Sequence, residues 1–121
     1  MRDNMDNQQL INDTMESCLE YIPRLINACE EIAISLQEDD GRWTEIYPDF
    51  LNGIEWLVKA ILGLQKFNLE IINEIKITEI NVILGDLENA FNHQDFVRLA
   101  DIFEYELKST LEEYLIKIKR D

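Results

Sequence analysis

Two pairs of acidic residues have the spacing with which a helix can hold a metal ion. Asp13 precedes Glu16 by three residues, and Asp101 precedes Glu104 by three. Acids one helical turn apart can converge on a single Mg²⁺ or Mn²⁺ ion, so a metal-dependent hydrolase is one hypothesis for this sequence. Both pairs lie beside apolar residues that predict the buried helix faces, which leaves the acids on solvated faces. We therefore predict no metal site.

The other residues that could do chemistry lack the neighbours that catalytic sites require. His93 is the only histidine, and Ala90 stands where a Glu-x-x-His motif of a di-metal bundle would have its glutamate. No arginine stands four to six residues before it, as in helical ribonucleases of the toxin type. The serines have no Gly-x-Ser-x-Gly turn, and the glycines form no Gly-x-Gly phosphate loop. We expect a non-enzymatic protein with no cofactor.

Cys18 and Cys29 are predicted to be core residues. Both fall on one apolar heptad seam, and eleven residues along a helix separate their Cα atoms by about 16 Å. That separation excludes a disulfide between them.

Apolar periodicity predicts an all-α, mainly antiparallel four-helix bundle that forms a single domain over residues 1–121. The first helix is long, covers roughly residues 5–37 and is kinked at Pro23, with Gly41 closing the turn that follows. The second helix covers 48–66, with Pro48 at its first position, and the third covers 78–91. The fourth covers 95–119 and follows a tight turn at 92–94. Residues 67–77 alternate like a short strand and are interpreted as a loop or helix start. The predicted seams of the third and fourth helices include Phe91 and Phe96, respectively.

The second helix is apolar around most of its circumference. Phe50, Ile54, Leu57, Ile61 and Leu64 form its seam, while a narrow polar stripe contains Asn52, Glu55, Lys59 and Lys66. A further stripe of small residues around a tryptophan is the candidate partner or packing face: Gly53, Trp56, Ala60 and Gly63. Such a stripe either packs within its own bundle or contacts a second chain.

The charge of the chain bears on its partners. The net charge is -14, and residues 1–58 hold 13 acids against 3 bases. Nucleic acid is not expected as a partner, because the only basic cluster is Lys117, Lys119 and Arg120, which suits a helix C-terminus. An acidic decoy that binds a basic protein through residues 1–58 is an alternative function. No apolar stretch has the length of a membrane span, so we predict a cytoplasmic protein that does not contact membranes.

Residues 50–57 (FLNGIEWL) and 93–107 (HQDFVRLADIFEYEL) resemble a family of small acidic helical proteins from Firmicutes. Some of its members are encoded near flagellar or surface-glycosylation genes. The family has no characterised activity, and the flagellin export chaperones offer only a physical analogy, because their Thr-Ala-x-Pro and Leu-Tyr-Asp-Gly signatures are missing here. We expect a protein-interaction module, adaptor or chaperone-like protein, with self-association through the second helix as an alternative.

Overall fold

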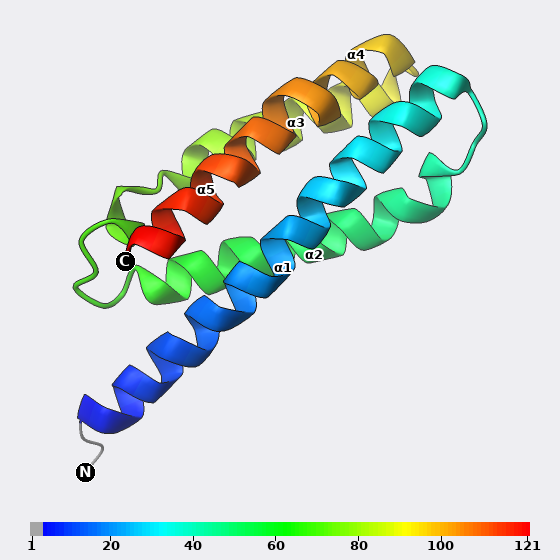
Figure 1. The fold of residues 1–121 in the computed structure, drawn as a ribbon. Coiled ribbons are helices and arrows are strands. Elements are labelled where there is room, and N and C mark those ends of the chain that lie inside the picture. Colours follow the sequence, from blue (N-terminus) through cyan, green and yellow to red (C-terminus); the bar gives the residue numbers. More distant parts are fainter. Residues whose placement is uncertain (1–3) are drawn as a thin grey trace.

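The computed structural model describes residues 4–121, and these residues form an all-α bundle, as predicted (Figure 1). Helix α1 covers Asn4–Glu38, α2 covers Trp43–Leu64 and α3 covers Ile77–Asn92. The last long helix consists of α4 (Phe96–Asp101), a π-helical turn η2 (Ile102–Leu107) and α5 (Lys108–Arg120) without interruption. A short 3-10 helix, η1, covers Ile72–Glu74.

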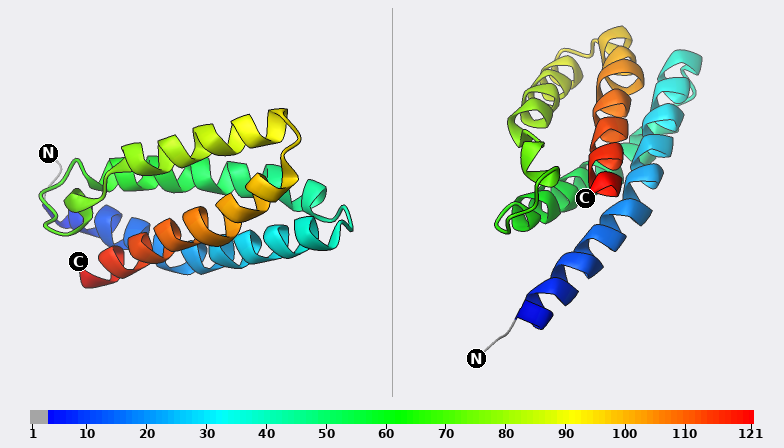
Figure 2. Two further views of the ribbon diagram at one scale, coloured as in Figure 1. Left: turned by 90° about the horizontal axis from the view of Figure 1, so that it is seen from above. Right: turned by 60° about the vertical axis from the view of Figure 1, so that its left-hand side comes forward.

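Consecutive long helices run in opposite directions. Helix α1 contacts both α2 and the last long helix. It packs against α2 on one side and against the α4–η2–α5 helix on the other, while α3 packs against α4 and η2 (Figure 2). Helix α1 continues through Pro23 as a single long helix, as predicted. The first turns of α1 project beyond the end of the bundle (Figure 1).

The core contains the apolar seams of all the long helices. The five seam residues predicted for α2 are all buried. Cys18 and Cys29 are both buried with free thiols, which confirms their prediction as core residues. Burial raises the pKa of Cys18 to about 11, and burial also raises that of Cys29 far above its ordinary value. Neither thiol is ionised near neutral pH.

The start of α2 differs from the prediction. The helix begins at Trp43, five residues before Pro48. The backbone N–H groups at its start find acceptors in the end of α1 and in the turn: Trp43 N donates to Ser35 Oγ at 2.9 Å, and Arg42 N, just before the helix, donates to the Asp40 carboxylate at 3.0 Å. The prediction at Pro48 was wrong because these acceptors lie outside α2 and satisfy its first turn upstream of the proline.

The turn between α1 and α2 closes through Asp39 before it reaches Gly41. Asp39 has a φ of 55°, and Asp40 N donates back to Ser35 O at 3.3 Å, which is the geometry of a Schellman motif. Gly41 is also left-handed, with a φ of 78°, but it stands two residues after the position that ends the helix.

The π-turn keeps four apolar side chains, each four residues after the last, on one face of the last long helix. Leu99, Phe103, Leu107 and Leu111 are all buried. In a regular α-helix each four-residue step drifts by about 40° around the axis, and a π-turn, with more residues per turn, reduces that drift. The widened turn therefore holds all four side chains against the core.

Phe91 and Phe96 depart from their predicted seams, since their side chains are 41% and 45% exposed. Both lie at the turn between α3 and α4, where the bundle ends. Each ring packs against Trp43, with ring centroids 6.0 Å apart for Phe91 and 5.7 Å apart for Phe96. The prediction that these two side chains belong to the buried seams is therefore wrong, and both rings pack against Trp43 at the exposed end of the bundle instead.

Residues 65–76 form a compact connection with no strand. Gln65 Nε2 donates to the carbonyl oxygens of Ile72 at 3.0 Å and Ile75 at 2.7 Å. The Asp121 carboxylate accepts from Ile71 N at 3.2 Å and Ile72 N at 2.7 Å. Ile72, Ile75 and Ile77 are buried. Ile72 lies in η1 and Ile77 begins α3, while Ile75 and Lys76 between them have extended backbone that pairs with no strand among the described residues.

Candidate protein-docking groove

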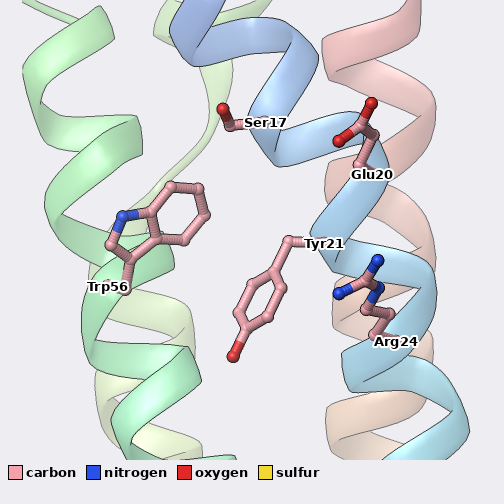
Figure 3. Close-up of a pocket in the computed structure, with 5 residues that line it drawn as sticks. All are labelled: Ser17, Glu20, Tyr21, Arg24 and Trp56. Atoms are coloured by element: carbon pink, nitrogen blue, oxygen red, sulfur yellow. The ribbon is translucent and has the colours of Figure 1, made fainter.

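A hollow of about 360 Å³ lies between the middle of α1 and the middle of α2. Ser17, Glu20, Tyr21 and Arg24 of α1 and Trp56 of α2 line it, and the rings of Tyr21 and Trp56 point toward each other across the gap (Figure 3). The ring centroids are 5.3 Å apart and the ring planes meet at 80°, which is the edge-to-face geometry that aromatic pairs prefer. Trp56 remains 41% exposed.

Two more hollows continue this one toward the N-terminus of α1. The second, of about 370 Å³, is lined by Asp13, Thr14, Ser17, Trp56, Lys59 and Ala60. The third, of about 250 Å³, is lined by Leu10, Ile11, Thr14, Lys59, Ala60, Gly63, Leu64 and Phe67. Because each hollow shares lining residues with the next, the three form one open surface groove, the α1/α2 groove, along α1 from Arg24 to Leu10. That stretch of helix is about 21 Å long.

Gly53 explains why the two helices approach closely at one end of the groove. A Cβ atom at Gly53 would lie 2.5 Å from Tyr21 Oη and 2.8 Å from Leu25 Cδ2, closer than van der Waals contact allows. A Cβ atom at Gly63 would meet nothing within 4 Å. The helices therefore touch at Gly53 and leave open space beside Gly63, toward the N-terminus of α1.

The stripe predicted on the second helix lies at this junction. Trp56, Ala60 and Gly63 line the α1/α2 groove, and Gly53 is buried beneath Tyr21. The opposite wall was not predicted. Its residues Thr14, Ser17 and Tyr21 follow spacings of three and four, so a stripe of small polar residues leading to an aromatic ring was the signal in the sequence.

The acidic pairs considered for metal binding lie on the outside of the bundle. Asp13, Glu16 and Asp101 are exposed, and Glu104 accepts a hydrogen bond from Gln37 Nε2 at 3.0 Å. Among the side chains that the structure describes, those of residues 7–121, no three His, Cys, Asp or Glu groups come together in a way that could hold a metal ion. His93 lies in the α3–α4 turn, with its Nδ1 2.8 Å from the carbonyl oxygen of Asn89.

An aromatic cluster at the end of the bundle was also missed from the sequence. Tyr47 stacks on Phe91 with centroids 5.1 Å apart, and Trp43 contacts Tyr47, Phe91 and Phe96. Burial, with a smaller effect from Glu88, raises the pKa of Tyr47. The rings come from α2, α3 and α4, so no periodicity within one helix could have brought them together.

The comparisons with known proteins identify a family but no activity. Among the helices of the described residues, none is long and apolar enough to pass through a lipid bilayer. Searches of curated proteins and of solved structures each gave no match. The family described as a domain of unknown function, DUF8042, matches residues 13–117, which include both walls of the groove except its Leu10–Ile11 end. The chain therefore belongs to the DUF8042 family.

Proposed function

We propose that this protein is a non-enzymatic interaction module, an adaptor or chaperone-like protein, that holds a helix of a partner protein in the α1/α2 groove. One observation carries the proposal: a continuous groove about 21 Å long has an aromatic side chain, Trp56, that is 41% exposed where its first and second hollows join. Two antiparallel helices that part to leave such a groove can accept a third helix, as in other helix-in-groove complexes.

Trp56 has the properties of an anchor for a partner. Tryptophan is the residue most often responsible for binding energy at protein interfaces, especially where neighbouring groups can exclude water. Tyr21 supports one edge of the indole ring, and Ala60, one helical turn further along α2, leaves room beside it. A partner side chain placed over this ring would bury apolar surface that now faces solvent.

The family resemblance supports where to search for the partner. Some members of the Firmicutes family that this chain resembles are encoded near flagellar or surface-glycosylation genes. The protein products of such genes, while they are in the cytoplasm, are therefore the first candidates for the partner. The proposal itself depends only on the groove.

Site-specific photo-crosslinking in cells tests the proposal. A photoreactive phenylalanine analogue at Ser17, which lines the groove, should form crosslinks that the same analogue at Ser109 on α5 does not form. Both serines are exposed and helical, which makes the two positions a matched pair. Adding Trp56→Ala should remove the products that are specific to Ser17.

Identical products from both positions, or Ser17 products that persist with Trp56→Ala, would contradict a partner in the groove. A crosslinked dimer of the chain itself, specific to Ser17, would assign the groove to self-association instead.

A further inference from the structure

The electrostatics of the α1/α2 groove indicate what kind of helix it takes, and this inference rests on the function proposed above. Asp13 and Glu20 line the groove, and Glu16 lies between them at spacings of three and four residues. Residues so spaced share one side of a helix, so the three exposed carboxylates form an acidic stripe along the α1 edge of the groove.

The acidic stripe has no cationic partners among the described side chains. No lysine or arginine nitrogen of these residues lies within ion-pair distance of Asp13, Glu16 or Glu20. The lysine of the opposite wall is already neutralised, because Lys59 Nζ is 3.0 Å from Glu55 Oε1. Arg24 lines the same hollow as Glu20, four residues further along α1, but the two side chains form no ion pair. A bound cation could therefore pair with the stripe without displacing an existing ion pair of these acids.

The overall charge disfavours a second copy of this chain as the occupant. Each copy carries a net charge of -14 and would bring the same acidic stripe to the contact. Repulsion between two such surfaces opposes association, whereas it favours the approach of a basic segment.

We infer that the α1/α2 groove recognises a basic amphipathic helix of about 14 residues, the length that matches 21 Å. Its apolar side chains occupy the three hollows, and its lysines or arginines face the acidic stripe. Tyr21, in the first hollow, stands eleven residues from Leu10, in the third. Apolar residues at positions i, i+4, i+7 and i+11 of the occupant would span that interval.

Titration calorimetry with synthetic peptides tests this inference. The probe is a helical peptide with leucines at i, i+4, i+7 and i+11 and lysines along one flank. The controls are a scrambled peptide of identical composition and a peptide with glutamine in place of every lysine. We expect the lysine peptide to bind most tightly, with an affinity that falls as salt is added.

Two sets of variants locate the binding. Trp56→Ala should weaken binding of the lysine peptide by about tenfold or more, as expected for an anchor residue. Asp13→Asn combined with Glu20→Gln should weaken it by about two- to thirtyfold, the effect of two exposed ion pairs. Asp101→Asn combined with Glu112→Gln removes the same charge from α4 and α5 and should have a smaller effect. All of these side chains are exposed, and circular dichroism checks that each variant is folded.

The outcomes separate this inference from the proposed function. Equal binding of the glutamine and lysine peptides, with both weakened by Trp56→Ala, would overturn the basic occupant and leave the groove as a docking site. Failure of the lysine peptide to bind, or binding that is insensitive to Trp56→Ala, would count against both. A dimer in sedimentation that Trp56→Ala dissociates would replace the basic helix with a second copy.

Discussion

Replacing Gly53 and Gly63 separately with alanine tests how closely α1 and α2 approach. Alanine is favoured over glycine within a helix by about 1 kcal/mol, and this gain is common to both positions. At Gly63 a Cβ atom meets nothing within 4 Å, so the full gain should appear as increased stability. At Gly53 the same atom would lie 2.5 Å from Tyr21 Oη and 2.8 Å from Leu25 Cδ2.

The contacts at Gly53 should more than cancel the helical gain. Leu25 is buried, and the Tyr21 ring is held against Trp56, so neither can move away without losing other contacts. Overpacking of this kind costs about 1–3 kcal/mol. Because the helical gain is the same at both positions, the unfolding free energies of the two variants should differ by that overpacking cost, about 1–3 kcal/mol, with Gly53→Ala the less stable.

Urea denaturation followed by far-UV circular dichroism measures this difference. Gly85→Ala, at another open helical position, serves as a second reference for the helical gain. Adding Tyr21→Phe to Gly53→Ala removes the nearest atom and should recover part of the loss. If Gly53→Ala proved as stable as Gly63→Ala, the close approach of α1 and α2 would be refuted, and with it the shape of the α1/α2 groove.

Three further predictions concern the turn, the thiols and the core. The Ser35 hydroxyl and other hydrogen-bond donors lower the pKa of Asp40 from 3.8 to about 2, so the stabilisation by its carboxylate is present above pH 3.8 and is lost as the pH falls toward 2. The difference in urea midpoint between the wild-type chain and Asp40→Asn should therefore shrink over that interval. A difference that stays constant would contradict the turn geometry. Cys18 and Cys29 should resist a thiol reagent at neutral pH until urea unfolds the chain, because burial keeps both protonated; rapid labelling of the folded protein would show that the core opens. Phe103→Ala should lower the unfolding free energy by about 3–5 kcal/mol, since its side chain is fully buried, and a loss below 1 kcal/mol would place it outside the core.

The sequence predicted best the features that depend on one helix alone. The seam of α2 from Phe50 to Leu64 is buried throughout because its spacing of three and four residues is sufficient to define a face. The start of α2 was missed because its acceptors, Ser35 and Asp40, belong to the end of α1 and the turn. Pro48 was therefore predicted to begin α2, although the helix begins five residues earlier at Trp43.

Features that depend on two helices were only half predicted. The α2 wall of the groove followed from the stripe around Trp56, but the α1 wall depends on where the helices touch, and that point is determined by Gly53 against Tyr21. The aromatic end of the bundle needed the relative placement of three helices. Phe96 has the periodicity of a core residue, but its side chain is 45% exposed at the end of the bundle.

The π-turn in the last long helix is a place where the chain can lose one residue without changing which side chains are buried. The buried seam that starts at Leu99 runs through Phe103, Leu107, Leu111 and Tyr114 to Ile118 in steps of 4, 4, 4, 3 and 4, whereas a regular seam alternates fours and threes. Loss of one exposed residue such as Tyr105 would convert these steps to 4, 3, 4, 3 and 4 and the π-turn to an α-turn, with the flanking helix still in register. In most other helical stretches of the bundle, a one-residue deletion would rotate the following residues by about 100° and turn buried side chains toward solvent. Relatives that differ in length by one residue should therefore carry the gap between residues 102 and 107.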